Sequence, residues 1–94
     1  MVRIFHDKKS GEYVVQTTCL EPDAFISDLS EALSQVVQKT TGDAALAALG
    51  ILTNAMPIAY KLSGYKADTV IEQRTLVCGT ATPSASDVVA TAGR

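Results

Sequence analysis

The chain has 94 residues, of which 47% are apolar and 19% charged, and this composition fits one compact domain over residues 1–94 and excludes the disordered class. Its net charge of −2 excludes a general attraction to phosphate backbones or acidic membranes, so that a nucleic-acid site must be a local basic patch. The first residues contain no apolar run of signal-peptide length, and no uninterrupted apolar stretch reaches roughly 18 residues, so we expect a cytoplasmic protein without a membrane partner.

Residues 2–5 and 13–20 are rich in β-branched and aromatic side chains, and the segment 7–11 between them has the composition of a turn. This pattern predicts a β-hairpin. One face of its second strand is expected to be buried, and it carries Tyr13, Val15, Thr17 and Cys19.

Residues 21–39 are predicted to form an amphipathic helix. Pro22 is tolerated in a first turn, and Glu21 and Asp23 suit the positive end of the helix dipole. Apolar residues recur three and four positions apart, which predicts that one side packs on a sheet. These residues are Phe25, Ile26, Leu29, Leu33, Val36 and Val37.

Residues 44–49 admit two interpretations, a short buried strand or the start of a long helix. Pro57 favours the strand, because proline inside a helix costs about 3 kcal/mol. In that interpretation Asn54 caps a second helix over residues 55–63, and Gly64 ends it in the left-handed conformation. The alternative is a single Pro-kinked helix.

Residues 69–78 are predicted to form a long strand, with Glu72 and Arg74 on a half-solvated face. Residues 80–94 are a loosely ordered tail or contain a short edge strand over 87–91. The expected fold class is therefore α/β (α+β), a small two-layer sandwich in which an N-terminal hairpin strand precedes β-α-β-α-β(β). The alternative is ββααβ with a Pro-kinked second helix.

Two segments resemble the central part of Alba-like proteins, and they are about equally similar to the small bacterial stage V sporulation protein S. In residues 42–62 a short strand ends at Gly50 and a loop leads into a helix; the strand over 70–79 then ends at Gly79. The resemblance spans residues 13–80 and implies an Alba-like sandwich that dimerises and binds DNA or RNA.

The chain departs from the Alba pattern at its basic positions. Glu21 and Asp23 stand where Alba proteins usually carry lysines, and Leu49 stands where they often carry an arginine. The resemblance therefore supports the fold more than the activity.

The residues that usually carry catalysis form no recognisable constellation. His6 is the single histidine and has no Cys or Glu pair at metal-ligand spacing, which is typical of a surface histidine. Cys19 and Cys78 lack C-x-x-C spacing and are expected to be free thiols. We therefore predict a protein that is not an enzyme and has no cofactor, no metal and no small-molecule substrate.

The candidate nucleic-acid contacts are basic and aromatic. If they converge, the cations would hold phosphates and a tyrosine would stack on a base; otherwise the lysines serve only to keep turns and helix ends soluble. These candidates are Lys8, Lys9, Lys61, Tyr65, Lys66 and Arg74.

Two functions follow from these patterns. The first is a non-enzymatic DNA- or RNA-binding Alba-like protein that acts as a dimer. The alternative is a homo-oligomerising interaction module without nucleic-acid binding, which associates through its apolar Ala/Leu strand or an exposed sheet edge.

Overall fold

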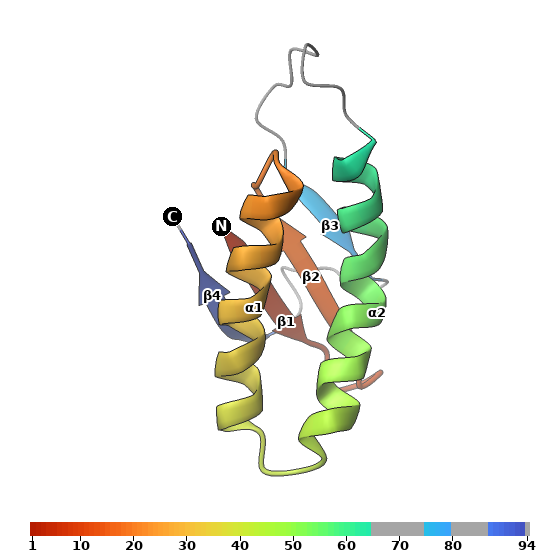
Figure 1. Cartoon of the computed structure of the whole chain (residues 1–94). Coiled ribbons are helices and arrows are strands. Elements are labelled where there is room, and N and C mark those ends of the chain that lie inside the picture. Colours follow the sequence, from red (N-terminus) through yellow and green to blue (C-terminus); the bar gives the residue numbers. More distant parts are fainter. Residues whose placement is uncertain (65–74, 80–86, 94) are drawn as a thin grey trace.

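The described part of the chain comprises two helices and four strands, arranged as a helical layer on one face of an antiparallel sheet (Figure 1). This computed structural model describes residues 1–64, 75–79 and 87–93. In chain order the elements are β1 (Val2–His6), β2 (Tyr13–Thr17), α1 (Pro22–Lys39), α2 (Ala44–Ser63), β3 (Leu76–Cys78) and β4 (Asp87–Ala92). The predicted small two-layer α/β class is confirmed.

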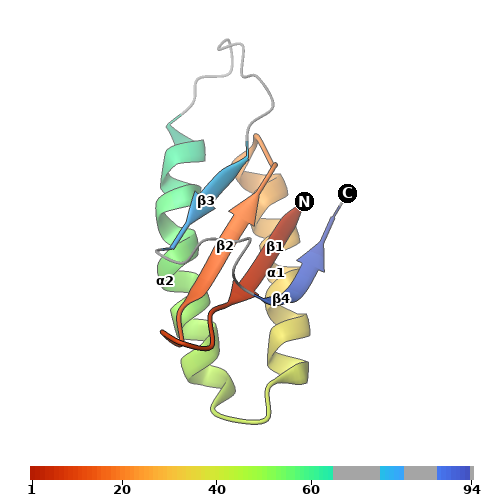
Figure 2. The ribbon, with the colours of Figure 1, turned by 180° about the vertical axis from the view of Figure 1, so that it is seen from behind.

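The sheet has the strand order β3-β2-β1-β4, which is seen best from the side opposite the helices (Figure 2). β1 and β2 form the predicted hairpin, in which Val2 pairs with Thr17. β4 lies along the other side of β1, with Val2 opposite Ala92 and a bulge between Ile4 and Phe5. The expected edge strand near the end of the chain is thus present and extends to residue 92.

The core lies between the helices and the sheet. Val15, Thr17 and Cys19 are buried and Tyr13 is half-buried, which confirms the predicted inner face of β2. The helices contribute Phe25, Leu29, Ala32 and Val36 from α1, and Ala47, Ile51, Ala55, Ile58 and Leu62 from α2. The prediction for α1 was wrong at Ile26 and Val37, which are exposed.

Residues 44–49 are helical, so the favoured strand was wrong and the single long helix is correct. The side chain of Asp43 caps α2 by accepting a hydrogen bond from the Leu46 N–H at 3.1 Å. Five buried residues then follow at spacings of four, four, three and four, which ties the whole helix to the core. Pro57 lies inside α2 on its exposed side, so its ring meets no core residue, although it removes the N–H that would donate to the Thr53 carbonyl.

Two further predictions for this region are wrong because α2 is continuous from Ala44 to Ser63. Asn54 does not cap a helix but lies within α2, and its side-chain amide donates to the Tyr13 carbonyl. Gly64 ends α2 at φ −79°, an ordinary right-handed conformation rather than the left-handed one. Asn54 therefore joins α2 to β2 instead of starting a new element.

The predicted long strand is described only at its end. β3 covers Leu76–Cys78 and pairs with β2, with Val15 opposite Cys78. Residues 69–74, including Glu72 and Arg74, lie outside the described residues. Cys19 is buried and Cys78 half-buried, and both are free thiols, as predicted.

Candidate functional site

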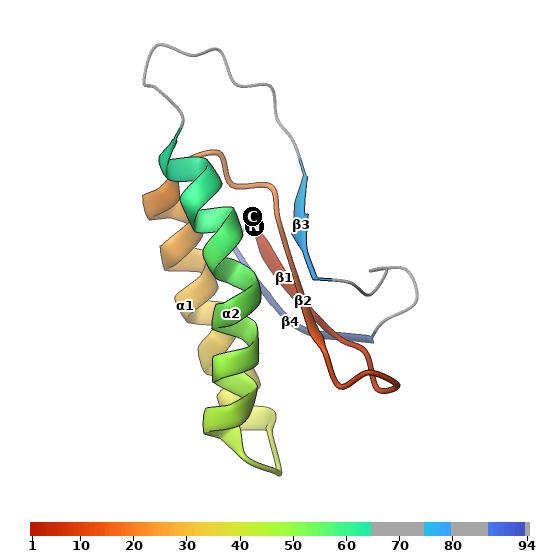
Figure 3. The same cartoon turned by 90° about the vertical axis from the view of Figure 1, so that its right-hand side faces the viewer.

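The outer side of α2 carries large apolar side chains that are mostly exposed. Figure 3 shows α2 in front of α1, with the sheet to one side of the two helices. Leu46, Leu49, Met56 and Tyr60 are 66%, 61%, 65% and 84% exposed. We call these four residues, together with the exposed Thr53 among them, the α2 stripe. Contiguous apolar patches on a protein surface mark interaction sites.

The α2 stripe has the spacing of a helix-packing seam. Its members Leu46, Leu49, Thr53, Met56 and Tyr60 are three, four, three and four residues apart. This is the a/d spacing of a heptad repeat, in which one helix packs lengthwise on another. The buried residues of α2 occupy the opposite side of the helix, so the stripe is a second and separate apolar face.

The exposed side of α1 is mainly polar, unlike the exposed side of α2. The exposed side of α1 carries Asp23, Glu31, Gln38 and Lys39 with several serines. Ile26 and Val37 are the large apolar residues that interrupt this polar surface. By contrast, residues 44–60 of α2 contain no charged side chain. A helix that is apolar all round normally has a packing partner on every side.

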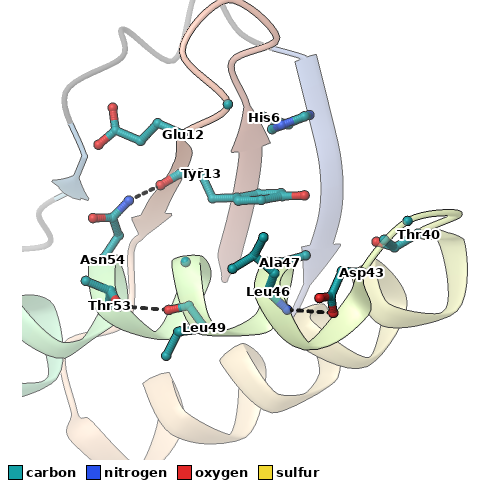
Figure 4. A pocket seen from close by; sticks show the side chains of 13 residues that line it. His6, Glu12, Tyr13, Thr40, Asp43, Leu46, Ala47, Leu49, Thr53 and Asn54 are labelled. Atoms are coloured by element: carbon teal, nitrogen blue, oxygen red, sulfur yellow. Dashed lines mark hydrogen bonds between the residues drawn. The ribbon is translucent and has the colours of Figure 1, made fainter.

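A cleft of about 630 Å³ adjoins the stripe where the two helices extend beyond the sheet (Figure 4). Leu46 and Leu49 belong both to the stripe and to the lining of this cleft. On the sheet side, the His6 ring stacks on Tyr13 with centroids 4.5 Å apart, so His6 is not a bare surface histidine. Gly50 of α2 faces the Tyr13 ring, where an added Cβ would lie 3.5 Å away, in ordinary van der Waals contact.

The opposite end of β1 is tied to α1 by a polar cluster. The Met1 amino group lies 3.2 Å from Asp28 Oδ2 and 3.2 Å from Cys19 Sγ. Burial lowers the pKa of this amino group, but the hydrogen bonds and charges of Cys19 and Asp28 outweigh burial and raise the pKa above its ordinary value of 8.0. Each polar partner here is satisfied within the cluster, which marks it as structural.

Three of the predicted nucleic-acid contacts are described, and Lys61 lies on a different element from Lys8 and Lys9. Lys8 and Lys9 lie in the β1–β2 turn, and Lys8 pairs with Asp87 at 3.2 Å. Lys61 is in the last turn of α2, about 16 Å along the helix from Gly50, the residue that faces Tyr13 beside the hairpin turn. Tyr65, Lys66 and Arg74 lie outside the described residues.

Within the described ranges, no group of three or more His, Cys, Asp or Glu side chains could hold a metal ion. In the same ranges α2 is the one helix long and apolar enough to cross a membrane by length and composition. The core helix of a soluble protein passes the same test, and α2 packs on the sheet through its buried face. Length and composition therefore do not distinguish a membrane partner from a protein partner.

Comparisons with known protein families, with curated proteins and with solved structures found no match to this chain. The candidate site is therefore defined by its own geometry, an uncharged heptad-spaced apolar stripe beside a cleft.

Proposed function

We propose that this chain is a non-enzymatic protein-interaction module that self-associates through the α2 stripe. The observation that carries the proposal is the exposure of four large apolar side chains at heptad spacing on one helix face. An interface between two identical copies places the same surface on both sides, so it suits a surface without charge. The stripe meets this condition, because residues 44–60 carry none.

The size of the apolar surface fits a dimer of ordinary stability. Leu52 lies beside the stripe and is itself 41% exposed. With it, the apolar side chains of this face offer on the order of 600 Å² per copy, taking roughly 100–150 Å² for each. A standard protein interface buries about 800 Å² per partner, and the neighbouring small side chains would supply the remainder.

Sedimentation velocity and light scattering across a wide concentration range test the proposal. We expect the mass of the wild type to rise to that of a dimer. Leu49→Asp or Met56→Asp places a charge in the apolar contact of both copies and should weaken association at least tenfold. Ile26→Asp is the matched control, because it puts the same charge on the exposed side of α1.

Two results would overturn this function. One is a wild-type protein that stays monomeric at every concentration. The other is binding of the monomer to neutral lipid vesicles that Met56→Asp abolishes, which would assign the stripe to a membrane surface. Circular dichroism of each variant checks that the fold is retained.

Nucleic-acid binding by an Alba-like protein stays a prediction from the sequence. The separation of Lys61 from the turn lysines favours the protein-binding function over it. Titration of labelled single- and double-stranded DNA and RNA at low and moderate salt checks the prediction. Affinity that falls steeply with salt would support a nucleic-acid role.

A further inference from the structure

We infer that two copies pair with their α2 helices antiparallel, crossing at Thr53, so that Tyr60 of each copy lies against Leu46 and Leu49 of the other. This inference rests on the proposed self-association and adds its direction and register. Three independent features of α2 support it.

The first feature is the symmetry of the stripe about Thr53. Leu46 lies seven residues before Thr53 and Tyr60 seven residues after it. In an antiparallel pair that crosses at Thr53, residues equally far from the crossing face each other. Tyr60, the most exposed side chain of the stripe, then meets Leu46 at the rim of the partner's cleft, where there is room for a large ring.

The second feature is the distribution of charge at the two ends of α2. Asp43 caps its first turn and Lys61 lies in its last turn. Parallel helices would bring Asp43 beside Asp43 and Lys61 beside Lys61, which is unfavourable. Antiparallel helices bring each Asp43 near a Lys61 and also align the helix dipoles favourably.

The third feature is the hydrogen bonding of Thr53, the polar residue at the crossing. Its hydroxyl donates to the Leu49 carbonyl at 2.8 Å within the same helix. The donor is therefore satisfied before any partner arrives, so burying Thr53 against its copy leaves no unpaired hydroxyl proton. Its small side chain also lets the two helices approach closely at this point.

Cysteine cross-linking tests the direction of the pair. Leu46→Cys and Tyr60→Cys are made in a Cys78→Ala background, with Cys19 left in place because it is buried. One of the two proteins carries a tag that changes its mass. A short bismaleimide is added to each protein alone and to an equal mixture, and the products are separated by electrophoresis.

For an antiparallel pair, we expect the equal mixture to yield mixed cross-linked dimer. Its amount should be at least five times the amount of cross-linked dimer that either protein forms alone. The two Leu46→Cys thiols would lie about 21 Å apart along the helix, beyond the reach of the reagent. Thr53→Cys should cross-link with itself, which confirms that the stripe is the contact.

The failures of the two proposals are distinguishable. Efficient cross-linking of Leu46→Cys and Tyr60→Cys each with itself would show a parallel pair, which overturns this inference and leaves self-association standing. A dimer by light scattering in which none of these cysteines cross-links would place the contact elsewhere and overturn both. A monomer at all concentrations also overturns both.

Discussion

Gly79 lies at the end of β3 directly against Val14 of the neighbouring strand. Its φ is +126°, a region that side chains rarely adopt, and an added Cβ would lie 3.0 to 3.3 Å from atoms of Val14. Val14 is fully buried, so it cannot move aside without disturbing the sheet. Glycine is therefore required here both by conformation and by contact.

We expect Gly79→Ala to lower the free energy of unfolding by about 1–3 kcal/mol. The matched control is Gly42→Ala, because a Cβ at Gly42 meets nothing within 4 Å and its φ is not in the left-handed region. That control should change the free energy of unfolding by less than about 0.5 kcal/mol. Urea unfolding of both variants measures the difference, and equal effects would contradict the contact with Val14.

Asp7 organises the turn of the hairpin. Its carboxylate accepts hydrogen bonds from the Lys9 N–H and the Ser10 hydroxyl, each at 3.0 Å. The bond from Lys9 and then that from Ser10 lower the pKa of Asp7 below its ordinary value of 3.8. A lowered pKa means that the charged carboxylate stabilises the fold above pH 3.8 and that this contribution is lost as the pH falls through the folded-state pKa.

Asp7→Ala should therefore lower the melting temperature at neutral pH, and the difference from the wild type should shrink below pH 3.8. Glu31→Ala, a change of an exposed carboxylate on α1, is the control. Thermal melts recorded from pH 7 to pH 2.5 give the comparison. A difference that stays constant over this range would show that the charge of Asp7 does not support the turn.

At the scale of elements, α2 is a continuous helix that tolerates a proline in its interior. Pro57 removes the backbone donor that would reach the Thr53 carbonyl, at a cost of about 3 kcal/mol in an ordinary helix. We expect Pro57→Ala to raise the free energy of unfolding, by about 1–3 kcal/mol. If a new helix began at Asn54, Pro57 would instead lie in a first turn and its replacement would bring no gain.

Guanidinium unfolding at one fixed protein concentration measures this change, since self-association also affects apparent stability. Ser30→Ala, an exposed change within α1, shows the size of an ordinary effect. A loss of stability in Pro57→Ala would contradict a continuous helix.

The hairpin and α1 could be predicted from sequence because their apolar residues follow a single period. The continuity of α2 could not be predicted, because the sequence does not show that Pro57 lies on the exposed side of the helix. The cap at Asp43 and the spacing of the buried residues are both present in the sequence. The exposed apolar residues of α2 obscure that spacing. The Ala/Leu stretch was predicted as a contact, but as a strand. The rest of the stripe was not predicted, since a helix that is apolar on both sides shows no clear amphipathic pattern.

Whether the candidate basic residues lie together in space could not be predicted from the sequence. Lys8 and Lys61 are far apart in sequence, and their distance in space depends on how β1, β2 and α2 pack together. Side-chain composition alone carries no information about that packing. The resemblance to Alba-like proteins likewise stays a prediction about residues 13–80.

For the whole molecule, self-association makes stability depend on concentration. A dimer of folded chains is favoured by mass action over unfolded monomers, so the melting temperature of the wild type should rise as the protein is concentrated. In Leu49→Asp the melting temperature should rise less with concentration than in the wild type, because association is weaker. Calorimetric scans over a hundredfold range of concentration make the test, and identical behaviour of the two proteins would contradict a folded dimer.

The pairing of β1 with β4 joins the two ends of the described chain, since Val2 lies opposite Ala92. Pairing two strands so far apart in sequence costs more chain entropy than forming the local β1–β2 hairpin. Within the described sheet β4 is also an edge strand, and the Gln35 side chain of α1 donates a hydrogen bond to the Thr91 carbonyl of β4. The amide protons of β4 should therefore exchange with solvent before those of α1 and α2. The sheet would then open first at β4, while α1, α2 and the α2 stripe remain folded.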